Sequence, residues 1–218
     1  MVGARQRLRQ LLRIAFEHEG TLDCIVGDAV AIMFSAPVPQ PDHPARALAC
    51  ALAMQRFASS YAATQQAQGV PFGRTRIGVH CGEVVVGNFG GATIFDYRAL
   101  GDPVNTAARL ETLDRHLGTG TCVSGAIRAA CPDAVMRPVG QVLPNGKRQA
   151  LAVCEALDGR APDTDYEAAH ALLAAGDTGA TAAFLRLHAA RPDDALVAFH
   201  LRRLQTGEKG DLVVMADK

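Results

Sequence analysis

The order of the predicted helices and strands constrains the fold more than any other feature of this sequence. Apolar residues recur at helical spacing within 4–18, and two β-prone runs follow within 21–34, joined by the two-residue turn Gly27-Asp28. Hairpins that alternate with crossing helices predict an α+β sandwich, in which helices cover a mostly antiparallel sheet. The remaining elements are helices at 45–67, 102–117 and 125–131, strands within 74–88, at the end of 89–100 and at 121–124, 135–143 and 149–157, and a turn at Asn145-Gly146.

The composition changes after residue 157. DGRAPDTD, residues 158–165, is typical of a linker, and Ala- and Leu-rich helices are predicted beyond it near 166–175, 179–190 and 194–205. We therefore expect an α+β domain at 1–157, a linker at 158–165 and an all-helical tail at 166–218. This tail resembles tetratricopeptide packing, although it is too short to form a solenoid.

Composition and charge exclude several classes of function. The 218 residues contain 22 basic and 22 acidic side chains, so the chain has none of the excess positive charge that a nucleic-acid binder needs. No apolar run approaches the ~20 residues of a membrane helix. Six cysteines are scattered without a C-x-x-C pair, as expected for small buried side chains in a reducing compartment. We therefore expect a cytoplasmic protein that binds no nucleic acid and has no membrane segment.

Few residues suggest chemistry by their position alone. Asp28 at a hairpin tip could bind a hard cation such as Mg²⁺, although Gly-Asp is also ordinary turn chemistry. Asn105 and Arg109 are four apart on the predicted helix 102–117 and share one face, where Arg109 could bind a phosphate or simply belong to a polar stripe. His80 and Cys81 are neighbours in a predicted strand and point to opposite faces, which argues against a Cys-His nucleophile.

Four segments together resemble the catalytic domain of class III nucleotidyl cyclases, the adenylate/guanylate cyclase family. The resemblance implies a ferredoxin-like sandwich and a head-to-tail homodimer or heterodimer with sites at the interface. It also implies conversion of ATP, or of GTP, into a 3′,5′-cyclic nucleotide and pyrophosphate at a two-ion site for Mg²⁺ or Mn²⁺. The segments are GTLDCIVGDAVAIMFSAP (20–37), RIGVHCGEVVVGN (76–88), DYRALGDPVNTAARLE (96–111) and PVGQVLPNGKRQALAVCEAL (138–157).

The resemblance assigns roles to five positions. Asp28 matches the second metal-binding aspartate, Asn105 matches the asparagine that orients the ribose, and Arg109 matches the arginine that stabilises the transferred phosphate. Cys24 and Arg98 stand at the positions that contact the base. Adenine-selecting cyclases usually have Lys at the first of these positions and Asp or Thr at the second, so the preferred purine is not evident from these two residues.

The family's other metal aspartate belongs to an opening strand that precedes the first helix. This chain begins within that helix, so we expect an N-terminally truncated cyclase domain without its first strand and without independent activity. One hypothesis is a cyclase that makes cyclic AMP, or less often cyclic GMP, and whose coding start lies further upstream. The alternatives are a catalytically inactive dimerisation or regulatory module, which could lend Asn105 and Arg109 to a partner, and a fragment that folds poorly.

Overall fold

The structure, a computed structural model, describes residues 2–90, 95–144 and 148–215. The predicted turn at Asn145-Gly146 lies outside these residues. The helices are α1 (Val2–Glu17), α2 (His43–Ala67), α3 (Asp102–Leu117), α4 (Gly125–Ala130), α5 (Thr164–Ala174), α6 (Ala180–Ala190) and α7 (Ala195–Gln205). The strands are β1 (Thr21–Val26), β2 (Ala29–Met33), β3 (Ile77–Val79), β4 (Val85–Gly90), β5 (Phe95–Leu100), β6 (Thr121–Ser124), β7 (Met136–Leu143), β8 (Leu151–Ala156) and β9 (Leu212–Val214).

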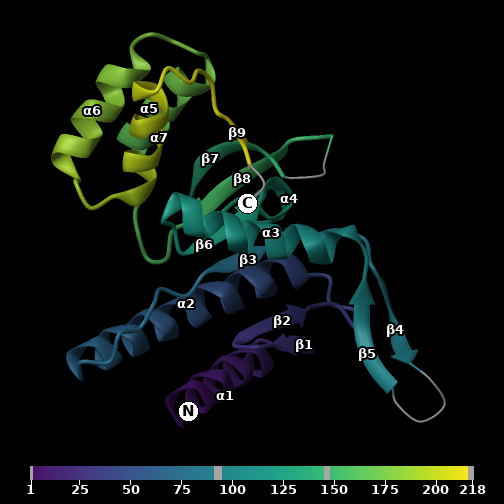
Figure 1. The fold of residues 1–218 in the computed structure, drawn as a ribbon. Coiled ribbons are helices and arrows are strands. Elements are labelled where there is room, and N and C mark those ends of the chain that lie inside the picture. Colours follow the sequence, from purple (N-terminus) through teal and green to yellow (C-terminus); the bar gives the residue numbers. More distant parts are fainter. Residues whose placement is uncertain (1, 91–94, 145–147, 216–218) are drawn as a thin grey trace.

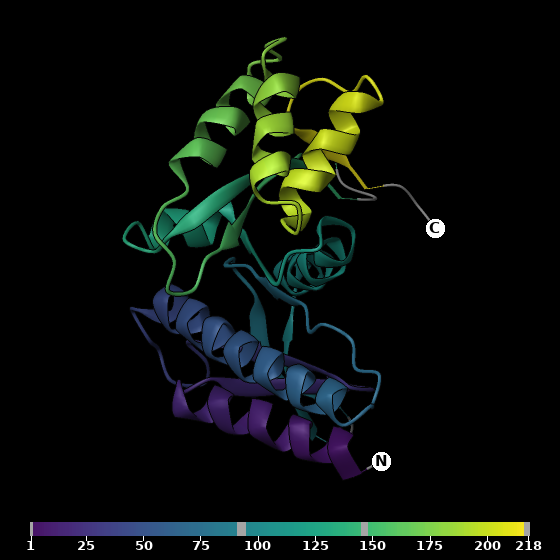
Figure 2. The same cartoon turned by 90° about the vertical axis from the view of Figure 1, so that its left-hand side faces the viewer.

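The largest sheet has five strands in the order β3-β6-β8-β7-β9 (Figure 1). The central pairs β6–β8 and β7–β8 are antiparallel, whereas β3 pairs with β6 and β9 pairs with β7 in parallel. Helices cover this sheet, so the predicted α+β sandwich is confirmed. The sheet stands between the N-terminal helices and the three helices of the C-terminal part, as the second view makes clear (Figure 2).

Neighbouring residues of the central strands face two different cores, because side chains alternate across a strand. Cys122 and Val153 belong to a core with the apolar face of α3 and with α5–α7. Val123 and Cys154, their neighbours in sequence, belong to a second core with α2 and α4. All four residues are less than 5% exposed, so the middle of the sheet is buried on both faces.

Two further strand pairs form separate two-stranded sheets, β1–β2 and β4–β5, both antiparallel. We predicted a loop and a short strand within 89–100, whereas β5 runs over Phe95–Leu100 and pairs along its whole length with β4. The side chain of Asp23 links the two pairs, since its Oδ1 accepts the backbone N–H of Ala99 at 2.7 Å. This buried carboxylate holds β1 against β5.

The C-terminal part departs from the prediction of an all-helical tail, because it returns to the sheet as strand β9. Leu212 to Val214 pair in parallel with Gln141 to Leu143 of β7. The chain just before β9 can lie this close to β7 because residue 140 is a glycine. Its φ is +129°, and an added Cβ there would lie 2.3 Å from the Asp211 carbonyl oxygen. The sequence gives little sign of this strand, since it has three residues and its partner lies some 70 positions earlier.

The helices of this C-terminal part complete the core of the sheet. Tyr166, Phe184 and Leu196 are fully buried and belong to the same apolar cluster as Leu113 of α3 and Val139 of β7. The Tyr166 hydroxyl donates to the carbonyl oxygen of Pro138 at 2.8 Å, which satisfies the polar end of a ring that is otherwise buried. The packing of α5–α7 is therefore continuous with that of β7 and β8.

Candidate functional site

Asn105 and Arg109 lie one turn apart on α3, as predicted. Pro103 occupies the first turn of this helix, and Gly118 ends it in the left-handed conformation. The buried face of α3 carries Leu110 and Leu113, whereas Asn105 is exposed and Arg109 is partly buried.

The guanidinium of Arg109 has an incomplete set of hydrogen bonds. Its Nη1 is buried, and within the described part of the chain it has no hydrogen-bond partner. A buried guanidinium N–H without an acceptor is costly, since such groups are normally paired. Because this nitrogen is closed to solvent in the single chain, an oxyanion beside α3 would become its acceptor only if the side chain turns outward.

Asp28 is at the turn between β1 and β2, and its side chain is 89% exposed. The nearest positive group is Arg7 of α1, whose Nη1 lies 3.7 Å from Asp28 Oδ2. Arg7 is itself held in place, because its Nη2 donates to Thr75 Oγ1 at 3.0 Å and its guanidinium lies 5.7 Å from the centre of the Phe72 ring. Asp28 is thus an accessible carboxylate next to a fixed cation.

The described residues do not form a complete metal site. No group of three or more His, Cys, Asp or Glu side chains in 2–90, 95–144 and 148–215 is arranged to hold a metal ion. Mg²⁺ and Mn²⁺ prefer several oxygen ligands, and a two-ion site needs more than one carboxylate. Asp28 can therefore contribute a single ligand at most, and the neighbouring Arg7 opposes a cation there.

The two predicted base-contacting positions lie on adjacent strands, Cys24 on β1 and Arg98 on β5. Burial, followed by the neighbouring Asp23, raises the pKa of the Cys24 thiol, while the positive charge of Arg98 acts in the opposite direction. The thiol is therefore neutral at physiological pH. Arg98 Nη1 donates to Asp96 Oδ2 at 2.9 Å, which holds the guanidinium beside its own strand. This pair offers a weak donor and a cation, in place of a lysine and an acceptor.

The five predicted residues form three separate groups in the chain. Asn105 and Arg109 share α3, Cys24 and Arg98 lie on neighbouring strands, and Asp28 is at the hairpin tip. Within the described part of the chain, Asp28 shares no hydrogen bond or ion pair with the other four. No hydrogen bond or ion pair among the described residues therefore joins the hairpin tip to the other two groups.

Two contacts near these groups were not predicted. Arg7 of α1 pairs with Asp28 of the β1–β2 turn. Cys81 contacts a histidine other than its neighbour His80, since His43 Nε2 lies 3.4 Å from Cys81 Sγ. Both contacts join residues more than 20 positions apart, so periodicity in the sequence gives no sign of them.

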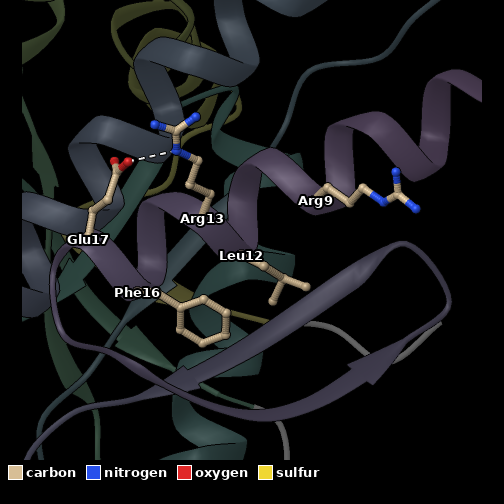
Figure 3. A pocket seen from close by; sticks show the side chains of 5 residues that line it. All are labelled: Arg9, Leu12, Arg13, Phe16 and Glu17. Carbon is tan, nitrogen blue, oxygen red and sulfur yellow. Dashed lines mark hydrogen bonds and ion pairs between the residues drawn. The ribbon is translucent and has the colours of Figure 1, made fainter.

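A shallow groove lies along α1 (Figure 3). Phe16 is 56% exposed there, and Arg13 Nε donates to Glu17 Oε1 at 2.8 Å across one helical turn. All the lining residues come from this one helix: Arg9, Leu12, Arg13, Phe16 and Glu17. The groove contains none of the five residues to which the sequence assigns roles.

The comparisons with known proteins agree with this architecture. Residues 14–127 match the family described as the Adenylate and Guanylate cyclase catalytic domain. The chain therefore belongs to the adenylate and guanylate cyclase family, whose members are nucleotidyl cyclases. It is 40% identical over 139 residues to Adenylate cyclase 1 of Rhizobium meliloti (strain 1021), a match that covers 63% of this chain and 21% of that protein.

Solved structures give the same family assignment. The adenylyl cyclase CyaB from P. aeruginosa is 27% identical with a TM-score of 0.66, and the match covers 72% of this chain and 82% of that one. The guanylyl cyclase Cya2 is also 27% identical, with a TM-score of 0.61 and coverage of 71% and 80%. An adenylyl and a guanylyl cyclase are thus equally similar in sequence. The chain spans only about a fifth of the length of the curated relatives that it matches.

No helix in the described ranges combines the length and the apolar character needed to cross a membrane.

Proposed function

We propose that this chain is a nucleotidyl cyclase domain that converts ATP into 3′,5′-cyclic AMP and pyrophosphate. The observation that carries the proposal is the Arg109 guanidinium, which shares one face of α3 with Asn105 and has a nitrogen without a hydrogen-bond partner among the described residues. The choice of ATP is supported by the 40% identity to a protein named Adenylate cyclase 1.

In this proposal Arg109 acts on the α-phosphate of the substrate and Asn105 acts on its ribose. In the reaction, the ribose 3′-hydroxyl oxygen forms a bond to the α-phosphorus, the bond from the α-phosphorus to the pyrophosphate oxygen breaks, and the hydroxyl proton is released to solvent. Arg109 donates hydrogen bonds to the α-phosphate oxygens, where negative charge increases in the transition state. Asn105 accepts or donates a hydrogen bond at the ribose and so orients the attacking hydroxyl.

The active assembly is a head-to-tail dimer, either of two copies or of this chain with another cyclase domain. Asp28 is 89% exposed, and among the described residues no hydrogen bond or ion pair joins it to Asn105 or Arg109. A partner can therefore approach the hairpin tip and bring its own α3 residues to Asp28. Asp28 would contribute one carboxylate to the metal site, with the remaining ligands coming from outside the described residues.

Cys24 and Arg98 contact the purine in this proposal. Neither residue supplies the lysine and the acceptor that adenine-selecting cyclases use, so the residues themselves do not explain a preference for ATP. Arg98 is anchored by Asp96 at 2.9 Å, which leaves its other nitrogens free to donate to a purine acceptor. Product analysis is therefore the decisive measurement for the base.

The experiment incubates the purified chain with ATP or GTP in Mg²⁺ or Mn²⁺ and separates the products by chromatography. Cyclic AMP from ATP, absent in the Arg109→Ala variant, supports the proposal. Cyclic GMP as the main product would overturn the choice of purine. If the chain alone is inactive, it is mixed with a cyclase domain that retains its metal aspartates and lacks its arginine. Activity in the mixture supports the dimer, and its absence would favour the inactive module.

A further inference from the structure

A polar cleft of about 430 Å³ lies outside the groups described above, between α2, the start of β6 and the end of β8. Its walls come from four separate parts of the sequence, one of which is Gly120 and Thr121 at the start of β6. Gln55 and Arg56 belong to α2, Arg74 precedes β3, and Glu155 with the residues after it closes the far side. The lining residues are Leu52, Gln55, Arg56, Ser59, Arg74, Gly120, Thr121, Glu155, Ala156, Leu157, Asp158 and Arg160.

The charges that line the cleft leave two guanidinium groups without a carboxylate partner. Arg56 is matched, because its Nη1 donates to both carboxylate oxygens of Asp158 at 2.7 and 2.8 Å. Arg74 donates through Nη1 to the Gly118 carbonyl oxygen at 2.9 Å, which uses one of its five donors. Arg160 has no hydrogen bond or ion pair in the part of the chain that the structure describes.

The two acidic residues of the cleft are both paired with other arginines, Asp158 with Arg56 and Glu155 with Arg137. Glu155 Oε2 accepts from Arg137 Nε at 2.6 Å, and Arg137 does not line the cleft. Burial raises the pKa of Glu155, and the positive charges of Arg137 and Arg160 oppose that rise. Glu155 is therefore hydrogen-bonded to an arginine outside the cleft, and neither Arg74 nor Arg160 has a carboxylate within ion-pair distance among the described residues, although the charge of Arg160 acts on Glu155.

Two buried oxygen atoms in the same cleft also lack a partner. Thr121 is only 2% exposed, and its Oγ1 has no hydrogen-bond partner among the described residues. The Oε1 atom of Gln55 is buried and unpaired as well. Buried polar atoms are normally hydrogen-bonded, so unpaired ones in a cleft indicate a place where a polar ligand fits.

We propose that this cleft binds a small molecule that carries an oxyanion, a phosphate or a carboxylate, between Arg74 and Arg160. Guanidinium groups bind such planar or tetrahedral oxyanions with paired hydrogen bonds. The hydroxyl of Thr121 donates a further hydrogen bond to the ligand, and the Gln55 oxygen accepts one from a hydroxyl or amine elsewhere on it. The site is distinct from Asn105, Arg109 and Asp28.

A chain of hydrogen bonds connects the cleft to the C-terminal helices. Glu155 lines the cleft and binds Arg137, and Arg137 donates through Nη1 and Nη2 to Asp194 at the start of α7. A ligand anion on Arg160 takes up the other positive charge that acts on Glu155, so Glu155 then pairs with Arg137 alone, and Arg137 is held more firmly to the first turn of α7. Slower amide hydrogen exchange in that turn is the expected sign of such coupling.

The test measures the thermal unfolding midpoint of the full chain while phosphate or succinate replaces chloride at constant ionic strength. We expect the midpoint to rise and to saturate with one of the two probes, as it does when a ligand binds only the folded state. Whichever of the two saturates at the lower concentration identifies the source of the oxyanion. A rise that does not saturate with either probe is a general effect of the salt and would overturn the proposal.

Two variants and a control make the test specific to the cleft. Arg160→Gln, at an exposed position with no hydrogen bond or ion pair among the described residues, should raise the concentration for half-saturation about tenfold, and Arg74→Gln should have a similar effect. Arg186→Gln on the exposed face of α6 removes the same charge away from the cleft and should leave the half-saturation unchanged. Equal responses in all three variants would contradict binding between Arg74 and Arg160. None of these readouts depends on cyclase activity.

Discussion

Arg137 of β7 binds the carboxylate of Asp194 with two hydrogen bonds, of 2.6 and 2.9 Å, across 57 positions of sequence. Arg137 is 4% exposed, and its guanidinium carbon lies 4.8 Å from the centre of the Tyr166 ring. Asp194 Oδ1 also accepts the backbone N–H groups of Leu196 and Val197, which caps α7. One arginine thus fixes the start of α7 to the central sheet.

Replacing Arg137 by leucine should lower the free energy of unfolding by about 3–5 kcal/mol, because it leaves the carboxylates of Glu155 and Asp194 buried without a cation. Chemical denaturation followed by circular dichroism measures the change. Arg13→Ala is the control, since Arg13 forms an exposed one-turn ion pair with Glu17. Its loss should cost less than about 1 kcal/mol. Equal effects of the two substitutions would show that the Arg137 contacts contribute no more than a surface pair.

Asp114 should make the fold less stable as the pH rises from about 4 to 6. Burial is the main cause that raises its pKa from 3.8 to about 6, although Cys122, Thr119 and the Ile77 N–H donate to the carboxylate and oppose the rise. Between these two pH values the folded state binds a proton that the unfolded state has lost. The free energy of unfolding should therefore fall by about 3 kcal/mol across this range.

The measurement is urea denaturation at several pH values for the natural chain and for Asp114→Asn. The amide does not titrate, so the variant should lack this part of the pH dependence. The difference in the free energy of unfolding that remains at every pH measures the effect of the altered hydrogen bonds. An unchanged slope between pH 4 and 6 in the variant would assign the dependence to other groups.

His200 should make the fold less stable as the pH falls below 6.5. Its side chain is fully buried, neither ring nitrogen has a partner in the described ranges, and Phe184 and Phe199 lie against it. Burial, followed by the nearby His170, holds the pKa of His200 well below 6.5. As the pH falls below 6.5, the unfolded state gains a proton that the folded state excludes, so stability is lost.

His200→Phe keeps an aromatic ring in this position without a titrating nitrogen. The variant should gain stability relative to the natural chain as the pH is lowered from 7 to 5, and the gain should be smallest above pH 7. Thermal unfolding at each pH measures it. A pH-independent difference between the two proteins would mean that His200 also binds protons in the folded state.

Gly78 should not tolerate a side chain. A Cβ at this position in β3 would lie 2.1 Å from the Ala107 carbonyl oxygen and 2.5 Å from the Glu111 nitrogen, both in the backbone of α3. Gly78→Ala should therefore destabilise the fold by several kcal/mol, as overpacking against rigid backbone does. Gly73→Ala is the matched control, since nothing lies within 4 Å of a Cβ there. Expression level and unfolding midpoint distinguish the two variants.

Arg109 should be needed for turnover and dispensable for folding. Removing an electrostatic stabiliser of a transition state typically lowers the rate by about 10²–10³. Arg109→Ala should show this loss in the cyclase assay, with an unfolding midpoint equal to or above that of the natural chain, because a buried unpaired nitrogen is removed. A fall in the midpoint together with the activity would instead make Arg109 a structural residue.

Local chemistry in the sequence was sufficient to predict most helices and strands. The proline in its first turn and the glycine at its end define α3, and the Gly27-Asp28 turn defines β1 and β2. Such signals act within a few residues, so they persist whatever the tertiary context. The shared face of Asn105 and Arg109 was predicted for the same reason, since helical periodicity alone fixes it.

The tertiary structure alone decided what these elements contact. Strand β9, the Arg137–Asp194 pair, the Arg7–Asp28 pair and the cleft around Arg74 and Arg160 each join residues that lie far apart in sequence. No periodicity or turn residue encodes such a pair, because its two members meet only when the intervening chain has folded. The sequence by itself thus determined the order of the elements and the residues of α3, and long-range packing determined which charges are matched and which remain free to bind.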